Sequence, residues 1–421
     1  MSEAALTRSE LARYGLLGLP LAFVALPLYI VLPNHYARAF GVPLAALGTV
    51  LLLTRLLDAL TDPWIGRWID QWQERSSAAV LRIAGAGAML LALGFAALFA
   101  PPMRTHPALL VWAAVMLAIT YLGYSAVSVV HQAWGARLGG DQVQRSRITG
   151  TREALALLGV LVAAAAPTFI GLPAMAVLLA MLLLTAWIAL ASSRRPVASA
   201  TTQGVPTTTL LLPLRNPVFR RLLGVFVVNG IASAVPATLV LFFVQDRLQA
   251  PAALQPAFLG LYFLCAAVSV PAWLAVVRRI GLSRTWLVGM GLAIVAFAFA
   301  FALRAGDHVA FLVVCAVSGL ALGTDLALPS ALLAGVIGAA GHRGRHEGAY
   351  FGWWNLAAKL NLALAAGLVL PALQLAGYAP GRRDEQALAA LSLAYCALPC
   401  ALKLVAAAAL QRFVTTQGVD A

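Results

Sequence analysis

The sequence predicts an all-α membrane protein with twelve transmembrane helices arranged in two six-helix halves. Three observations lead to this fold class: the composition, the number of long apolar runs, and one polar stretch near the middle of the chain. Of the 421 residues, 62% are hydrophobic and 10% are charged, and the mean hydropathy is +0.89. A soluble domain would carry about 25% charged residues. The composition therefore excludes a soluble enzyme, a disordered chain and a secreted disulfide scaffold.

Twelve apolar runs are long enough to cross a hydrocarbon layer of about 30 Å, which takes roughly 20 residues. They are rich in Leu, Ala and Val and show no period-two alternation, so we expect helices, which satisfy their own backbone hydrogen bonds in lipid. The first six runs lie near residues 12–36, 45–69, 78–100, 107–133, 150–171 and 173–192. The other six lie near residues 220–243, 257–278, 283–304, 308–337, 349–376 and 386–410.

A polar stretch rich in Ser, Thr, Pro and Arg separates the sixth run from the seventh. We therefore expect an N-terminal half at residues 1–192, a cytoplasmic linker at 193–219 and a C-terminal half at 220–421. This organisation is similar to that of the major facilitator superfamily, in which the substrate binds near the midplane between the halves.

The basic residues predict the orientation in the membrane. With the N-terminus in the cytoplasm, 20 of the 29 Lys and Arg residues fall on cytoplasmic loops and ends, six on external loops and three within the spans. The positive-inside rule therefore places both termini in the cytoplasm of a multi-pass protein of the plasma (inner) membrane. The first run is full length and has no A-x-A site, so we expect it to remain as a helix. The arginines alternate with apolar segments rather than with aromatic residues, so no nucleic-acid partner is expected.

Three charged residues share one face of the second run, because Arg55, Asp58 and Asp62 follow i, i+3 and i+4 spacings. A charge inside a span costs at least about 2.5 to 3.5 kcal/mol and marks a functional candidate. Two carboxylates could bind Na⁺ through hard oxygen ligands or carry a proton, with Arg55 keeping the empty site near neutrality. Alternatively, Arg55 only fixes helix packing by pairing with one aspartate, and Asp62 caps a broken turn before Pro63.

Charges in the tenth and eleventh runs are further candidates for coupling. Asp325 lies between Gly323 and Pro329, which permit a broken or bent helix whose carbonyls face a cavity. Lys359 lies in the eleventh run, four residues after Asn355. We expect Lys359 to pair either with one of the second-run aspartates across the halves or with Asp325 within the second half. The alternative is a buried ion pair that only neutralises two charges.

Polar and aromatic residues of the fourth and eleventh runs are candidates for contacting a substrate. Aromatic faces could stack on sugar rings, with amide and imidazole groups as hydrogen-bond donors at the rim. Trp and Tyr are also common anchors at the membrane interface, and a histidine can be a packing residue. The candidates are Tyr121, Tyr124, His131, Gln132, Trp134, Trp353 and Asn355.

The sequence contains no Walker A loop and no zincin motif, and no nucleophile, base and orienting acid converge in its pattern. We therefore expect no enzyme activity and no cofactor other than a coupling ion, Na⁺ or H⁺. Transport would draw its energy from an ion gradient or from the gradient of the substrate.

The segment Arg55-Leu-Leu-Asp58-Ala-Leu-Thr-Asp62-Pro63 resembles the second-helix signature of the melibiose permease family, the glycoside-pentoside-hexuronide:cation symporters. Residues 144–153, 319–334 and 347–359 are similar to three further family patterns, so the resemblance spans nearly the whole chain. It implies cation-coupled symport with Asp58 and Asp62 as cation ligands. It also implies that Lys359 links the cation site to the gate and that Arg152 is a cytoplasmic gating contact.

The region after the second run resembles a degenerate form of the major facilitator loop between helices two and three. Gly66, Arg67 and Asp70, followed by Arg75, carry this resemblance. It implies that Arg67 and Asp70 latch helix ends by charge pairs during gating.

Two carboxylates that grip the sugar in galactoside-recognising members, in the first and fourth helices, are missing from this chain. A carboxylate that accepts two hydroxyl hydrogen bonds is the usual basis for orienting a sugar. We therefore expect another sugar, a glycoside with an apolar aglycone, or an amphipathic or lipid-like molecule as the small-molecule substrate. Symport by a monomer in the lipid bilayer is the main hypothesis. The alternative is an exporter or flippase of amphipathic compounds, and a non-transporting scaffold has little support because the linker has no motif.

Overall fold

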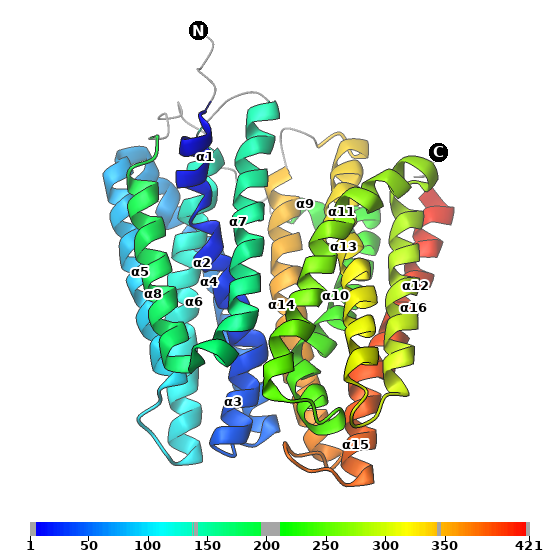
Figure 1. Ribbon diagram of the computed structural model, residues 1–421. Helices are drawn as coiled ribbons and strands as arrows, with labels where there is room; N and C mark the ends of the chain where they lie inside the picture. The colour runs from blue at the N-terminus through cyan, green and yellow to red at the C-terminus, as the bar shows by residue number, and fades with distance from the viewer. Residues whose placement is uncertain (1–5, 137, 139–141, 195–210, 343–346, 418–421) are drawn as a thin grey trace. The chain divides into compact units, whose positions relative to one another are not determined.

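The computed structural model describes residues 6–136, 138, 142–194, 211–342 and 347–417, and within these ranges every regular element is helical (Figure 1). The side chains of residues 62–64, 66–75, 136, 142, 143, 145, 146, 347, 348 and 415–417 are not described. Twelve helical segments of the described chain are long and apolar enough to cross a membrane. They coincide with the twelve predicted runs and confirm an all-α, multi-pass membrane protein.

The chain divides into two compact units. Unit 1 comprises Met1–Val42 and Leu53–Gln203, and unit 2 comprises Pro43–Leu52 and Gly204–Ala421. The long helix α4 (Leu44–Arg75) therefore contributes its first turns to unit 2 and the rest to unit 1.

The predicted linker at residues 193–219 is partly helical. Residues 195–210 lie outside the described residues, but α9 (Leu212–Arg215) and the first turn of α10 (Pro217–Phe242) fall within the predicted range. The Asn216 side chain accepts hydrogen bonds from the backbone N–H of Val218 at 2.9 Å and of Phe219 at 3.4 Å. Asn at the N-cap followed by Pro at the first helical position is a strong start signal, and it places the helix start at Pro217.

Unit 1 begins with a first span built from four consecutive helical pieces, α1 (Arg8–Gly15), α2 (Gly18–Leu26), η1 (Pro27–Val31) and α3 (Leu32–Ala39). Its other helices are α5 (Ser77–Phe99), α6 (His106–Ala136), α7 (Gln142–Phe169) and α8 (Gly171–Ala191). Helix α2 packs on α7, and α5 packs on α6 and α8. The contact between α2 and α7 needs glycine at position 159, because a Cβ there would collide with the carbonyl oxygen of Leu19.

Segment η1 is a wider, π-helical turn in which the backbone N–H of Leu32 bonds to the carbonyl of Pro27. Pro33 follows it, and in a regular α-helix its ring would clash with the carbonyl of Tyr29, four residues earlier. The wider turn avoids this clash. π-Helical turns inside α-helices are frequent at functional sites, and this one carries Tyr29.

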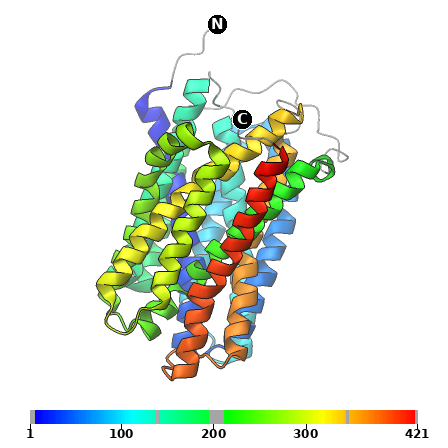
Figure 2. The ribbon, with the colours of Figure 1, turned by 90° about the vertical axis from the view of Figure 1, so that its right-hand side faces the viewer.

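Unit 2 contains α10, η3 (Phe243–Arg247), η4 (Ala252–Leu254), α11 (Gln255–Ile280), α12 (Leu282–Phe301), α13 (His308–Ala339), α14 (Glu347–Leu375), α15 (Glu385–Ser392), η5 (Leu393–Ala397) and α16 (Leu398–Gln417) (Figures 1 and 2). Helix α13 packs on α11 and α12, while α10 packs on α14 and α16. The tenth span is one continuous helix through Pro329, so it is not broken.

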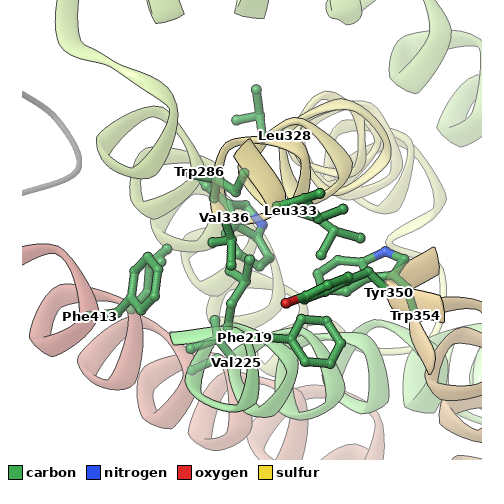
Figure 3. Packing of buried hydrophobic residues seen from close by; sticks show 14 of the residues in the cluster. Phe219, Val225, Trp286, Leu328, Leu333, Val336, Tyr350, Trp354 and Phe413 are labelled. Carbon is green, nitrogen blue, oxygen red and sulfur yellow. The ribbon is translucent and has the colours of Figure 1, made fainter. Parts of the chain in front are cut away.

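A buried hydrophobic cluster, in which aromatic rings pack among aliphatic side chains, forms one core of unit 2 (Figure 3). The rings of Phe226 and Trp354 stack with centroids 3.8 Å apart, and Phe219 meets the edge of Tyr350 at 4.9 Å. Trp286 on α12 belongs to the same cluster and is fully buried. Large rings packed at these distances add about 0.5 to 1.5 kcal/mol per pair beyond the area that they bury.

Candidate functional site

The second span places an acid and a base side by side inside unit 1. Arg55 Nη1 donates to Asp58 Oδ2 at 3.0 Å, and the Ser125 hydroxyl on α6 donates to Asp58 Oδ1 at 2.9 Å. Asp58 is 4% exposed and Arg55 is 7% exposed. The three-residue spacing on α4 aligns the pair, since residues three apart are neighbours on a helix surface. The result is a buried carboxylate with hydroxyl and guanidinium groups at its two oxygens.

Tyrosines surround the guanidinium group. The Cζ atom of Arg55 lies 4.7 Å from the centre of the Tyr121 ring and 5.0 Å from that of the Tyr29 ring. Together with Tyr124, these residues line a cavity of about 30 Å³, whose other lining residues are Val24, Ala25 and Leu28. A cavity of this size holds one or two water molecules or one functional group of a ligand. Two of the predicted substrate residues, Tyr121 and Tyr124, therefore meet the predicted coupling residue Arg55.

The other candidates of the fourth span lie elsewhere in unit 1. His131 is 1% exposed, and its Nε2 atom lies 2.9 Å from the carbonyl oxygen of Tyr14. The indole N–H of buried Trp134 donates to the carbonyl of Arg194 at 3.3 Å, and exposed Gln132 donates to Ser128. None of the three lines the tyrosine cavity. A substrate contact by His131, Gln132 or Trp134 stays a prediction.

The predicted gating residues are described only in part. Arg152 on α7 is half-buried and forms an ion pair with Glu153, with Nη2 and Oε1 2.6 Å apart. The side chains of Arg67 and Asp70, and that of the second cation-ligand candidate Asp62, lie outside the described residues.

Unit 2 holds a second buried acid and base, but its partners differ from the predicted ones. Asp325 on α13 pairs with Lys403 on α16, with Oδ2 and Nζ 3.2 Å apart, rather than with Lys359. Lys403 is 3% exposed. The sequence shows Lys403 as a charge inside the last span, but it gives no register between the tenth and twelfth spans that would have identified the pair.

Three further side chains complete this pair, which borders a cavity of about 20 Å³. Asn229 Nδ2 and the Trp286 indole N–H donate to Asp325 Oδ1 at 2.9 and 2.8 Å, and the Ser233 hydroxyl donates to Oδ2 at 3.1 Å. Lys403 Nζ donates to Asn229 Oδ1 at 2.9 Å and to the Ser233 hydroxyl oxygen at 3.1 Å. Asn229 and Ser233 are four residues apart on α10, so both face the pair. We call these five residues the Asp325–Lys403 network.

The remaining candidates lie on α14. Lys359 and Trp353 are half-buried, and Asn355 is exposed. Trp353 packs against the buried hydrophobic cluster of unit 2. Their predicted roles in coupling and substrate binding stay predictions.

A sequence profile of the MFS/sugar transport protein family matches residues 13–417, nearly the whole chain. The chain belongs to this family. It is therefore a transporter of the major facilitator superfamily, within the glycoside-pentoside-hexuronide:cation symporters that the second-span motif indicates, and not an enzyme.

Curated relatives found at low sequence identity include symporters. The chain is 27% identical to the inner membrane symporter YicJ of Escherichia coli strain K12 over 30% of this chain and 27% of the relative. It is also 27% identical to the putative glycoside/cation symporter YagG of the same strain, over 37% of this chain and 34% of the relative. The matched segments thus span about a third of the length of these relatives.

Solved structures share the fold. The nucleoside transporter NupG superposes with a TM-score of 0.73 at 13% identity, covering 97% of this chain and 99% of that one. A bacterial homologue of the human lysosomal transporter Spinster superposes with a TM-score of 0.71 at 11% identity, covering 99% and 98%. At such identities the likeness shows the major facilitator fold alone.

Proposed function

We propose that this family member is a secondary active transporter that couples the symport of a sugar, glycoside or related small solute to Na⁺ or H⁺. The observation that carries the proposal is the buried Asp58 carboxylate in a membrane span, with the Ser125 hydroxyl at Oδ1. Carboxylate and hydroxyl oxygens are the hard ligands that Na⁺ requires, and the same carboxylate can take up a proton. The names of the curated relatives, which include symporters and a glycoside/cation symporter, support the same class.

In the proposed cycle, the coupling cation binds at Asp58, with Asp62 as a second ligand. Cation binding favours the state that binds the substrate, and joint occupancy permits alternating access. Lys359 links the cation site to the gate, and Arg152 acts as a gating contact. Both termini lie in the cytoplasm, as the distribution of Lys and Arg predicts.

The first test is a stability panel on the purified transporter. Sugars, glycosides and lysolipids are each added with and without Na⁺ at two pH values, and the midpoint of thermal unfolding is measured. A ligand that binds the folded state raises this midpoint by mass action. Stabilisation by a sugar that increases with Na⁺ or acid is expected. Stabilisation by lysolipids alone would favour an exporter or flippase of amphipathic compounds instead.

The second test replaces the proposed cation ligand. We expect Asp58→Asn to abolish gradient-driven uptake of the stabilising sugar into proteoliposomes, because the amide carries no charge to bind a cation. The matched control is Asp384→Asn, which removes an exposed carboxylate next to α15. Accumulation that is equal in wild type and Asp58→Asn would contradict the proposal.

A further inference from the structure

The guanidinium group of Arg55 is incompletely satisfied in its buried position. Its bond to Asp58 runs through one nitrogen and one oxygen, whereas arginine and carboxylate often pair through two parallel bonds. Its Nε atom is buried and has no hydrogen-bond partner in the described structure. An unsatisfied buried donor costs about 1 to 3 kcal/mol, and more when it is charged. Arg55 also lines the tyrosine cavity, so this donor is a candidate contact for a ligand that binds there.

The tyrosine rings give the guanidinium a position that does not depend on Asp58. Both Tyr29 and Tyr121 lie within the distance at which an aromatic face attracts a cation, at 5.0 and 4.7 Å. If a coupling cation occupies the Asp58 carboxylate, Arg55 loses its counter-ion but keeps both ring contacts. The positive charge then remains in the cavity, where the described lining residues include no carboxylate.

The residues that line the cavity decide which group replaces this partner. They include one arginine and three tyrosines, and no carboxylate is among the lining residues that the structure describes. A neutral sugar hydroxyl both donates and accepts hydrogen bonds and draws no particular benefit from a positive charge, whereas a planar carboxylate matches the charge and the forked donors of a guanidinium. The cavity volume of about 30 Å³ fits a single such group.

We propose that Arg55 is an internal counter-ion: the coupling cation displaces it from Asp58, and the released guanidinium binds a carboxylate of the transported solute in the tyrosine cavity. The inference rests on the proposed function, because it needs a cation at Asp58. It predicts that Arg55 competes with the cation and attracts the solute. If Arg55 only fixed helix packing, its replacement would change cation binding and solute binding in the same direction, or would change neither.

The first experiment measures cation binding without a solute. The unfolding midpoint of purified wild type, Arg55→Gln, Arg55→Lys and Asp58→Asn is followed as NaCl replaces choline chloride, at pH 6.5 and pH 7.5. We expect Arg55→Gln to lower the half-saturating Na⁺ concentration about tenfold, because the competitor is removed; a tenfold change corresponds to about 1.4 kcal/mol. Arg55→Lys keeps the charge and should respond like wild type. If Arg55→Gln does not fold, Arg55→Met, which also removes the charge, provides the comparison and must lower the half-saturating Na⁺ concentration in the same way.

The outcomes separate this inference from the proposed function. An Na⁺ response that is lost in Asp58→Asn and is unchanged or weaker in Arg55→Gln would overturn the inference and leave the cation site intact. When Arg55→Gln cannot be purified, an unchanged or weaker Na⁺ response in Arg55→Met has the same meaning. No response to Na⁺ or to pH in wild type would overturn both.

The second experiment identifies the group that Arg55 binds. The probes are D-glucuronate and D-glucose, which differ only in a carboxylate against a hydroxymethyl group. In saturating Na⁺, we expect D-glucuronate to raise the unfolding midpoint of wild type and to lose at least tenfold in apparent affinity in Arg55→Lys, because lysine lacks the planar fork. Equal stabilisation by D-glucose, or no stabilisation by D-glucuronate, would overturn the carboxylate assignment.

Discussion

The Arg55–Asp58 pair of unit 1 and the Asp325–Lys403 pair of unit 2 both bury opposite charges inside membrane spans, and they differ in how many partners complete them. In unit 2, Asp325 accepts four hydrogen bonds and the Lys403 ammonium donates three. These numbers equal the capacity of a carboxylate and of an ammonium group. In unit 1, Arg55 has a donor without a partner among the described residues, and its pair is formed within one helix.

This difference separates a structural pair from an exchangeable one. The fully bonded pair of unit 2 joins residues of α10, α12, α13 and α16 and so holds four helices of one unit together. It borders a small cavity, but all of its hydrogen-bonding capacity is used within the protein, so none is left for a ligand. An incompletely bonded pair on a single helix beside a cavity can exchange a partner without unpacking helices. The sequence predicts charge coupling for Asp325 as well as for Arg55, and the geometry supports that role more strongly for Arg55.

The largest expected effect comes from removing one member of the unit 2 pair. Asp325→Leu leaves the Lys403 ammonium buried without a carboxylate, and breaking a buried pair in this way costs about 3 to 5 kcal/mol. We expect a much lower unfolding midpoint and a low yield of purified protein. The double variant Asp325→Leu, Lys403→Met removes both charges and should recover most of the midpoint.

Transport by the double variant decides the role of the pair. A structural role predicts that uptake returns together with stability. Loss of uptake in a stable double variant would show that Asp325 takes part in coupling, as the sequence predicts, and would remove the contrast between the two pairs.

The next effect is on the packing that positions Tyr29. Gly159→Ala on α7 places a methyl group against the Leu19 carbonyl of α2, so we expect a loss of about 1 to 3 kcal/mol in the free energy of unfolding. Gly150→Ala on the same helix is the matched control, because a Cβ there meets no atom within 4 Å. Alanine favours a helix over glycine, so the control should be neutral or stabilising. Similar unfolding midpoints for both variants would show that α2 and α7 leave room for a methyl group at position 159, which would contradict the close packing described above.

A smaller effect tests the aromatic support of Arg55. Tyr121→Leu removes one ring face and should cost about 0.5 to 2 kcal/mol, whereas Tyr121→Phe keeps the face. Thermal unfolding of the two variants in the same detergent measures the difference. If both variants unfold at the same temperature, the ring contact does not stabilise the guanidinium.

The smallest effect comes from an exposed carboxylate outside the spans. Asp384 accepts a hydrogen bond from the backbone N–H of Ala387 at 3.0 Å, and this bond lowers the pKa of Asp384. A pKa lowered by folding contributes stability above the unfolded value of about 3.9 and loses it as the pH falls through the folded value. Wild type should therefore lose this contribution below about pH 4, while Asp384→Asn, which keeps a capping side chain, should not. Parallel pH profiles of thermal unfolding would contradict this expectation.

Much of the fold could be predicted from the sequence because a bilayer leaves few options. Apolar runs of sufficient length must be helices, so the twelve spans and their approximate ends follow from composition alone. Finer features depend on local caps and on contacts between distant segments. The polar, Pro-rich stretch before the seventh span predicts a linker at residues 193–219, and within this range the Asn216 cap starts helix α10 at Pro217.

The candidate site could be predicted only where its residues share one helix. Arg55 and Asp58 follow from a three-residue spacing, and their ion pair is present. Ser125 and Tyr29 come from other helices and have no charge to mark them, and the pairing of Asp325 with Lys403 requires the register between two spans. One sequence contains no signal for such a register.

The position of Lys403 in the final helix has a consequence for biogenesis. An isolated lysine at the centre of a span opposes membrane insertion by about 2.5 to 3.5 kcal/mol, and Asp325 carries a similar cost two spans earlier, on α13. Until the ribosome has delivered α16, that aspartate lacks its cationic partner. The polar network of unit 2 therefore closes only after α16 has been synthesised, so a nascent chain that ends before Lys403 presents an uncompensated charge to the quality-control machinery of the membrane.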